Sequence, residues 1–483
     1  MYKGRLYVGL LAGIFFLMEA VNGQVTISLK DVIELAQSQS LQYKAEQTKK
    51  EVSYYEFLSY LSDRKPQVSF YGNAPNYSHQ FAPIVQPDGT IAYLPIKQNT
   101  ADVGFSLSQR IPFSGGTVSL NTDLNRYDDL QGKTFQYNGT PVFLQIAQPL
   151  FGVNDLRWAK KIEPLKLEES KRAYAEALEN IAQQASTLYF NALEAQENIR
   201  ISEFNLKHTE ENYEIEKRRV ALGTTTEDKV LQLELQVLTS NQNLQKAWYN
   251  YEIGLLNLKA LLGSKDSTHF TLVTPEEIPV FDVSLDQALL FARQTRPEYI
   301  AFERKKLEAE QEVAIAKAAK QQVNVSATFG LNRASTNLPD IYSSPKDQQT
   351  FSVGFNVPII DWGRRSAAYN TAKANLKLTE YNNEIEEINQ DQEITTLVRN
   401  IPLLRGDVVL TAKRDSVAKR RYSIANELYQ RGKLTVSELN IAQNEKDTAR
   451  QEFISSLRSF WDAYYLLRKI TLYDFERRNS LYP

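Results

Sequence analysis

The side chains that most often carry out chemistry in proteins are scarce in this sequence. The 483-residue chain has no cysteine, two methionines and three histidines, and the histidines (His79, His208 and His269) lie far apart. A thiolate site or a site built from several histidines is therefore nearly excluded, although a carboxylate site is not. We find no grouping of serine, histidine and acid, and no pair of glutamates in a catalytic context. The sequence predicts a protein that is not an enzyme and needs no cofactor or metal.

Three short stretches resemble binding motifs, but each has a simpler structural explanation. The glycine turn at 113–117 lacks the lysine of a phosphate-binding loop. The Arg-Gly-Asp triplet at 405–407 lies in a predicted helix, which argues against integrin-like recognition. Basic residues at 413–421 are interspersed with apolar ones at helical spacing and indicate a solvated helix face. Because the formal net charge is only −2, we expect no nucleic-acid partner.

The N-terminal residues have the pattern of a cleavable secretory signal. Lys3 and Arg5 give a basic start, an apolar run follows at 6–18, and small residues precede Gln24. The apolar run is shorter than the roughly 20 residues of a membrane-spanning helix, so we predict a signal peptide at 1–23. No later run is long enough for such a helix. Any membrane-spanning part of the mature protein must therefore consist of strands.

Six segments alternate between apolar and small polar side chains, the pattern of a strand whose two faces meet different surroundings. At 351–355, for example, phenylalanine and valine alternate with serine and glycine. The proline-rich stretch at 74–98 and the polar stretch at 128–139 are predicted to be loops. The predicted strands are 68–73, 100–111, 117–126, 142–150, 324–332 and 351–359.

Outside the strands, apolar residues recur at helical spacing. The predicted helices include 28–63, 151–222 (with Asn154 or Asp155 as its cap), 224–262, 361–431 and 435–475. Two of them have close to seventy residues and would extend over roughly 100 Å each. Between Tyr174 and Ile199, steps of four and three residues form a heptad seam rich in alanine, which indicates close coiled-coil packing. Gly223 and Gly432 end the two long helices, so each forms a helical hairpin with the helix that follows it.

The two halves of the chain share one plan. Pro358 follows Pro149 by 209 residues, and Gly432 follows Gly223 by the same spacing. In both halves these landmarks bracket a long helix. We therefore predict two tandem structural repeats, each with a helix, strands, a long helix and a return helix. The predicted repeats are 24–270 and 271–483.

Strands with one apolar face occur both in soluble sandwiches and in membrane barrels. Three features favour the membrane: the predicted export, the isolation of the strands between very long helices, and aromatic residues near the strand ends. Six strands cannot close a barrel with a useful lumen, so several copies must share one barrel. The long hairpins likewise bury both faces only if copies assemble around a ring axis. We predict a mainly α protein with a membrane β-barrel portion.

Motifs at the junctions and turns resemble those of TolC-type outer-membrane efflux proteins. QPLFGVNDLRW at 148–158 and VPIIDWGRR at 357–365 lie where strands meet helices. VALGTTTEDKVLQLELQ at 220–236 and LYQRGKLTVSELNIAQ at 428–443 lie where helices turn. Each motif is weak alone, but together, in order and at one repeat offset, they are specific. The resemblance covers essentially the whole mature chain.

The resemblance implies a homotrimer in the Gram-negative envelope. Three copies share one β-barrel in the outer membrane, which is continuous with a long periplasmic α-helical barrel. The implied function is passive efflux, as in type I secretion, with no chemistry in this subunit. The implied partners are a periplasmic adaptor (a membrane fusion protein), an inner-membrane pump and outer-membrane lipid.

The functional positions of the family can be assigned where the motifs match. The hairpin turns become adaptor-docking tips, at Leu222, Gly223, Thr224, Thr225, Arg431, Gly432, Lys433 and Leu434. Tyr429 matches a tyrosine that takes part in tip closure. Glu438 matches the first of two acids that ring the periplasmic entrance and favour cations, whereas the second position is Ile441 here. A solvated face of the return helix is the alternative for Glu438. The strand-to-helix junctions are marked by Pro149, Pro358 and Trp362.

The number of strands departs from the family, which usually has two in each half. The first half here has four, so the extra hairpin near 100–127 either joins the barrel or lies outside the bilayer. The first arrangement gives 18 strands per trimer and the second 12, and the strict alternation slightly favours the first. Two other functions are compatible with the sequence. One is an exported, non-conducting coiled-coil protein with a structural or adhesive role, and the other is a soluble periplasmic scaffold.

Overall fold

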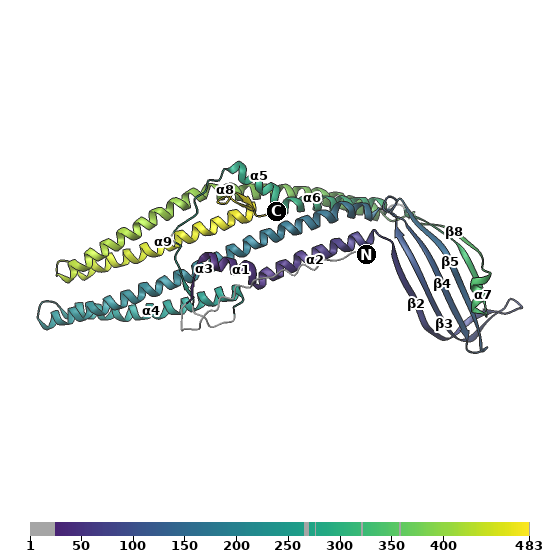
Figure 1. Cartoon of the computed structure of the whole chain (residues 1–483), viewed down its shortest axis with the longest axis horizontal. Coiled ribbons are helices and arrows are strands. Elements are labelled where there is room, and N and C mark those ends of the chain that lie inside the picture. The colour runs from purple at the N-terminus through teal and green to yellow at the C-terminus, as the bar shows by residue number, and fades with distance from the viewer. Residues whose placement is uncertain (1–24, 265–269, 276, 320–321, 357–358, 483) are drawn as a thin grey trace, which may run out of the picture. The chain divides into compact units, whose positions relative to one another are not determined.

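The computed structural model describes residues 25–264, 270–275, 277–319, 322–356 and 359–482 (Figure 1). The predicted signal peptide at 1–23 and Pro358 lie outside the described residues. The chain divides into two compact units. The sheet unit comprises Lys44–Asn180, Phe281–Asn400 and Leu466–Pro483, and the hairpin unit comprises Met1–Tyr43, Ile181–Val280 and Ile401–Tyr465.

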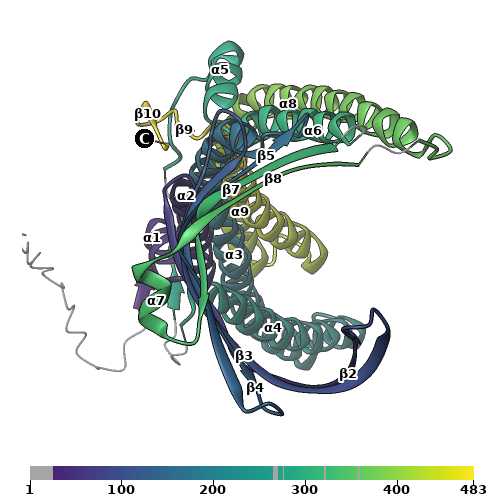
Figure 2. The same cartoon turned by 90° about the vertical axis from the view of Figure 1, so that its right-hand side faces the viewer.

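The sheet unit contains one antiparallel sheet of six strands, which curves as an arc (Figure 2). The strands are β2 (Gln67–Val85), β3 (Ile91–Arg110), β4 (Thr117–Asp129), β5 (Thr134–Leu150), β7 (Gln322–Ser335) and β8 (Lys346–Asn356). They lie in the sheet in their order along the chain. The extra hairpin of the first half is therefore part of the same sheet as the other strands.

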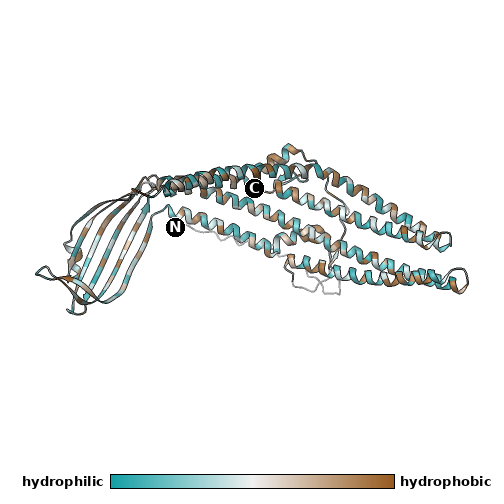
Figure 3. Ribbon diagram, turned by 180° about the vertical axis from the view of Figure 1, so that it is seen from behind, coloured by the Kyte–Doolittle hydropathy of each residue, from teal (hydrophilic) through white to brown (hydrophobic). Residues whose placement is uncertain are grey.

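The two faces of the sheet differ in polarity, as the alternation predicted. On one face Phe70 lies opposite Phe105, with ring centroids 4.8 Å apart, and Leu144 lies opposite Phe329. These large side chains are exposed. The opposite face carries small polar residues such as Ser69, and Figure 3 shows the alternation along the strands. An exposed apolar face of this extent is typical of a surface that meets lipid or another protein.

The loops predicted at 74–98 and 128–139 were wrong, because most of both stretches is strand. β2 and β3 pair as far as Val85 and Ile91. Prolines are tolerated there because β2 is an edge strand and the first part of β3 pairs with β2 alone. β4 and β5 likewise turn only at 130–133.

A short helix, α7 (Leu338–Ser343), interrupts the connection between β7 and β8 and packs against β5 and β7. Ile341 of α7 is fully buried over Gly139, where a Cβ atom would lie only 2.4 Å from the Ile341 side chain. Ser335 fixes the start of the helix by donating a hydrogen bond to Asp340 (2.8 Å). The absence of a side chain at Gly139 thus allows α7 to lie flat on the sheet.

Besides α7, the sheet unit contains α5 (Leu285–Thr295), α6 (Pro297–Ala318), most of α2 (Leu41–Asp63) and parts of α3 (Asp155–Ala221), α8 (Arg364–Gln430) and α9 (Val436–Thr471). Arg304 of α6 donates two hydrogen bonds to Glu169 of α3, of 2.5 and 3.0 Å. Asn383 of α8 donates to the Phe302 carbonyl of α6 (3.0 Å). These contacts place α6 beside both long helices. Two short strands, β9 (Tyr473–Asp474) and β10 (Asn479–Ser480), follow α9.

The helix predicted at 28–63 is in fact two helices, α1 (Leu29–Gln39) and α2. Its start is as predicted, because Ser28 and Asp31 form a capping box. The break falls at Ser40, whose backbone is extended (φ −61°, ψ 152°). The Ser40 hydroxyl accepts a hydrogen bond from the Tyr43 N–H (3.0 Å), so this residue begins the next helix instead of continuing the first.

The hairpin unit contains parts of two helical hairpins, one of α3 and α4 (Glu227–Leu262) and one of α8 and α9, as predicted. Two three-residue strands, β1 (Val25–Ile27) and β6 (Phe270–Leu272), pair in parallel and were not predicted, because strands this short show no periodicity. The Tyr189 hydroxyl of α3 donates to the Val273 carbonyl (2.5 Å) next to β6. Over the residues that the structure describes, no helix is both long and apolar enough to cross a membrane.

Candidate functional site

The hairpin between α3 and α4 turns through a left-handed glycine. Gly223 has a φ of 69°, and its N–H donates to the Val220 carbonyl (2.9 Å). The Thr224 N–H donates to the Arg219 carbonyl (2.9 Å), so the last carbonyls of α3 are satisfied in the manner of a Schellman motif. Three of the predicted tip residues are exposed and Thr225 is partly buried. The exposed ones are Leu222, Gly223 and Thr224.

The hairpin between α8 and α9 repeats this geometry. Gly432 has a φ of 72°, and its N–H donates to the Tyr429 carbonyl (2.9 Å). The Lys433 N–H donates to the Leu428 carbonyl (2.9 Å), at the same spacing as in the first tip. Arg431, Gly432 and Lys433 are exposed, whereas Leu434 is partly buried against the core of the hairpin. The structure thus gives both predicted tips the same turn.

Tyr429, the predicted gate residue, is a core side chain just before the second tip. It is 1% exposed and packs with Tyr422, Leu439 and Ala442 of α8 and α9. The Arg219 guanidinium of α3 lies 5.4 Å from the centre of its ring. Burial raises the pKa of Tyr429, so its hydroxyl stays neutral. Tyr429 therefore joins α3 to the second hairpin.

Glu438 is exposed and closes a capping box at the start of α9. Its carboxylate accepts hydrogen bonds from the N–H (2.9 Å) and the hydroxyl (2.7 Å) of Thr435. The Thr435 hydroxyl in turn accepts from the Glu438 N–H (3.3 Å). These hydrogen bonds lower the pKa of Glu438, so it stays ionised. The sequence Thr-x-x-Glu at 435–438 is the signature of such a cap, although the cap was not among the predictions.

Buried polar contacts that were not predicted from the sequence join the helices of the hairpin unit. Asn205 of α3 donates to Asp447 of α9 (2.6 Å). Arg450 of α9 donates to Glu197 of α3 (3.0 Å) and lies 3.6 Å from Asp415 of α8. The partners are separated by at least thirty-five residues of sequence, so no local sequence pattern predicts these contacts. They hold α3, α8 and α9 together above the tips.

Two helices of the hairpin unit expose apolar residues in rows. On α8 the row recurs every seven residues, and each member is more than half exposed: Leu403, Leu410, Val417 and Ile424. On α4 the row follows heptad positions: Leu231, Leu235, Leu238, Tyr249 and Leu256. Rows of this spacing are the seams of coiled coils, which pack against further helices. Neither row is buried within the described chain.

The first strand-to-helix junction lies in the sheet unit between β5 and α3. Pro149 still pairs with Asn324 of β7, one residue before β5 ends. Phe151 then takes a left-handed conformation, with a φ of 63°. Asn154 caps α3 by accepting a hydrogen bond from the Arg157 N–H (3.2 Å). The chain thus passes from strand to helix within five residues.

The second junction leads from β8 to α8, with Pro358 outside the described residues. Asp361 caps α8 by accepting hydrogen bonds from the N–H groups of Gly363 (3.0 Å) and Arg365 (3.2 Å). Trp362 has a φ of 55° and is 96% exposed. A fully exposed tryptophan at the end of an apolar sheet is typical of a membrane interface.

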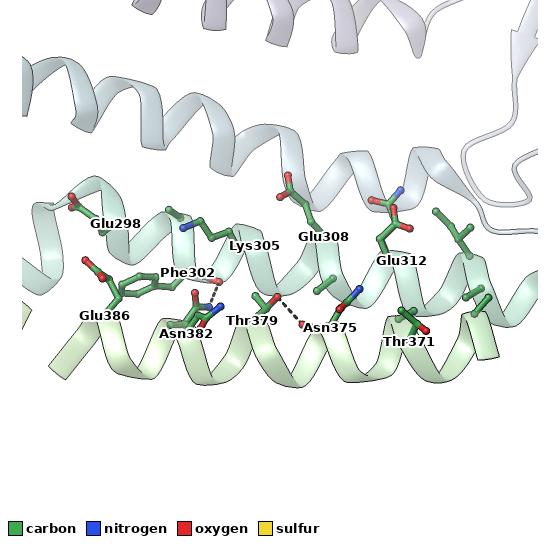
Figure 4. A pocket seen from close by; sticks show the side chains of 18 residues that line it. Glu298, Phe302, Lys305, Glu308, Glu312, Thr371, Asn375, Thr379, Asn382 and Glu386 are labelled. Carbon is green, nitrogen blue, oxygen red and sulfur yellow. Dashed lines mark hydrogen bonds between the residues drawn. The ribbon is translucent and has the colours of Figure 1, made fainter. Parts of the chain in front are cut away.

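A wide groove of about 1060 Å3 runs between α6 and α8 in the sheet unit (Figure 4). Carboxylates from both helices line it, among them Glu298, Glu308, Glu312 and Glu386, together with Lys305. Figure 4 shows these side chains spread along the groove instead of converging on one point. In the part of the chain that the structure describes, no three histidine, cysteine or acidic side chains are arranged to hold a metal ion.

Comparison with known proteins agrees with this architecture. The sequence matches the model of the family described as outer membrane efflux protein at residues 92–264 and 292–471. The probable outer membrane lipoprotein SilC of Salmonella typhimurium is 24% identical over 260 residues, 52% of this chain and 51% of SilC. The cation efflux system protein CusC of Escherichia coli K12 is 22% identical over 362 residues, 69% of this chain and 75% of CusC. The chain thus spans about half the length of SilC.

Among solved structures, the CmeC outer membrane channel of Campylobacter jejuni has the same fold. The TM-score is 0.67 at 17% identity, over 100% of this chain and 95% of CmeC. The coarse part of the predicted fold class is confirmed: this is a mainly helical protein with a sheet portion. Because the family model covers most of the sequence, the chain belongs to the outer membrane efflux protein family. CusC is described as a cation efflux system protein and CmeC as an outer membrane channel.

Proposed function

We propose that this protein is the outer-membrane exit duct of a tripartite export system. It receives its substrate from an inner-membrane pump through a periplasmic adaptor and releases it passively. One observation carries the proposal: a single chain combines a sheet with an exposed apolar face and helical hairpins with exposed heptad rows. The apolar face contacts outer-membrane lipid and the helices extend through the periplasm.

The working form is a homotrimer whose copies share one β-barrel and one α-helical barrel. The edge strands β2 and β8 each have a strand neighbour on one side only, as far as the chain is described. Pairing β2 of one copy with β8 of the next removes these edges, which a membrane does not tolerate. Six strands per copy then give 18 in the trimer. The exposed rows on α4 and α8 support the same assembly, because they need helices from another copy.

The helix lengths support the two tandem repeats at 24–270 and 271–483. α3 and α8 have 67 residues each, and α4 and α9 have 36 each. The matched tips therefore dock the adaptor as two equivalent surfaces, at Leu222, Gly223, Thr224 and Thr225 and at Arg431, Gly432, Lys433 and Leu434. Tyr429 keeps the second tip closed, and Glu438 supplies one acidic ring at the periplasmic entrance.

Conductance across a planar lipid bilayer tests the duct directly. Tyr429→Ala empties the core just before the second tip, so the purified variant should conduct at least tenfold more than the closed wild type. Removing a buried aromatic side chain costs about 3–5 kcal/mol of packing, enough to shift a closed tip toward the open state.

Two further variants sharpen the conductance experiment. Tyr93→Ala is the matched control, because Tyr93 is exposed on β3 of the sheet unit and belongs to neither heptad row, so this variant should leave conductance unchanged. Glu438→Gln in the Tyr429→Ala background should lower the preference for cations, read from the reversal potential. If neither the wild type nor Tyr429→Ala ever conducts, the non-conducting coiled-coil alternative replaces the duct. If Glu438→Gln leaves the reversal potential unchanged, the proposed acidic ring is refuted, but the proposed duct is not.

Cysteine cross-linking tests the shared barrel, because the natural chain has no cysteine that could interfere. Ser69→Cys on β2 is combined in turn with cysteine at 348, 350, 352 or 354 on the polar face of β8. At least one combination should give a covalent three-chain species on a non-reducing denaturing gel. A closed ring of three copies produces that species and nothing larger.

The control pairs Ser69→Cys with Phe351→Cys or Val353→Cys, whose side chains lie on the opposite, apolar face of β8. These combinations should cross-link far less, because neighbouring residues of a strand point to opposite faces. Equal cross-linking by both sets, or an open-ended ladder of products, would argue against a closed trimeric barrel.

A further inference from the structure

The sheet unit has a second pocket, of about 680 Å3, next to the first strand-to-helix junction. Its walls come from the start of α3 and the residues before it, from the end of α6 and from the second turn of α8. Three aromatic side chains line it: Phe151, Trp158 and Tyr369. Two cations line it as well, Arg157 of α3 and Lys317 of α6.

The two cations of the pocket lack acidic partners. Neither Arg157 nor Lys317 has a carboxylate within ion-pair distance among the residues that the structure describes. The backbone N–H of Arg157 already donates a hydrogen bond to the Asn154 side chain (3.2 Å). The groups that remain to bind an anion are therefore the guanidinium of Arg157 and the ammonium of Lys317. Unpaired cations from two helices that face one pocket are suited to an anion with several oxygen acceptors.

The pocket lies where the apolar face of the sheet ends. Leu150, the last residue of β5, is exposed and directly precedes Phe151 in the pocket wall. Phe355 near the end of β8 and Trp362 before α8 are also exposed. From the sheet toward the helices, the apolar surface comes first, the aromatic rings come next and the cations come last. The same order describes a phospholipid from its acyl chains to its phosphate.

We propose that this pocket binds the headgroup of an anionic phospholipid from the periplasmic leaflet of the outer membrane. Arg157 and Lys317 contact the phosphate, and the aromatic rings pack against the glycerol and the first acyl carbons. The bound lipid thereby fixes the junction between sheet and helices at the membrane surface. This inference depends on the proposed function, in which the apolar face lies in the outer membrane.

Native mass spectrometry of the detergent-solubilised trimer tests the site. Dioleoylphosphatidylglycerol is titrated into the wild type and into the double variant Arg157→Gln/Lys317→Gln. The double variant should bind this lipid about tenfold more weakly, since each cation near a lipid phosphate contributes of the order of a few-fold in affinity. Dioleoylphosphatidylcholine, which has no net charge, should bind the wild type about tenfold more weakly than the anionic lipid.

Lys160→Gln/Lys373→Gln is the matched control. It removes the same charge from exposed positions on α3 and α8 that do not line the pocket. It should bind phosphatidylglycerol within about twofold of the wild type. Equal losses in both double variants, or equal binding of the two lipids, would overturn the proposal. Displacement of the lipid by low millimolar inorganic phosphate would make this a phosphate site and would overturn the lipid assignment.

The readout separates this site from the proposed duct. Both double variants should still form the cross-linked trimer and conduct, which also shows that they fold. A wild type that neither cross-links nor conducts would refute the duct, whereas lipid binding in detergent is measured independently of that result.

Discussion

Replacing Arg468 with methionine should lower the free energy of unfolding by about 3–5 kcal/mol. In the sheet unit its guanidinium donates two hydrogen bonds to Glu179 of α3 (2.8 and 3.0 Å) and one to Asp474 after α9 (2.8 Å). The side chains of Glu179 and Asp474 are 6% and 1% exposed. Without the guanidinium, two buried carboxylates lose the cation that offsets their desolvation. Arg468 of α9 therefore joins α3 to β9, the short strand that follows α9.

Urea titration of the detergent-solubilised protein, followed by far-UV circular dichroism, measures the change. Arg414→Met is the control, because its ion pair with Glu452 (2.6 Å) is exposed and such pairs contribute about 1 kcal/mol or less. The double variant Glu179→Gln/Arg468→Met should regain part of the loss, because one of the two unpaired charges is gone. A loss below about 1 kcal/mol in Arg468→Met would show that water reaches the two carboxylates.

The second large effect is a pH dependence of stability that comes from Glu176 of α3. Burial, together with the nearby carboxylates of Glu298 and Glu393, raises the pKa of Glu176 to about 7. Arg296 and Lys469 act in the opposite direction but do not cancel the rise. These groups belong to α3, α8, α9 and the start of α6. The folded protein therefore binds a proton at Glu176 more tightly than the unfolded chain does, whose glutamate pKa is near 4.5.

The sign of the effect follows from this difference in pKa. Below about pH 4.5 both states hold the proton and the stabilising contribution is complete. As the pH rises toward 7, the unfolded chain releases the proton while the folded protein retains it, so stability falls. Above about pH 7 the contribution is lost. Between pH 5 and pH 8 the free energy of unfolding should fall by about 2–3 kcal/mol on account of Glu176.

Urea titrations at pH 5, 6, 7 and 8 compare the wild type with two variants. Glu176→Gln carries no titrating group at this position, so its decline over this range should be smaller by about 2–3 kcal/mol. Glu203→Gln, at an exposed position of the same helix, should keep the wild-type profile. An identical pH profile for the wild type and Glu176→Gln would mean that Glu176 is solvated in the folded protein.

The elements with a strong local period could be predicted from the sequence alone. The alternation of Phe351, Val353 and Phe355 can be recognised within a single strand, without knowledge of its partners. It indicated that the sheet has one apolar and one polar face. Gly223 and Gly432 indicated where the two hairpins turn, because a left-handed residue at the end of a long helix is usually glycine. The motifs around these turns and junctions were enough to indicate the family.

Only the tertiary structure decided the features that depend on distant partners. The stretch at 74–98 looked like a loop from its prolines, and it is strand because β2 lies at the edge of the sheet and accepts them. Tyr429 was predicted at the tip, but only packing against α9 and the approach of Arg219 make it a core residue. The charges of Arg468 and Glu176 could be counted in the sequence, whereas their burial could not. Burial, and hence their energetics, arises where helices far apart in the chain come together.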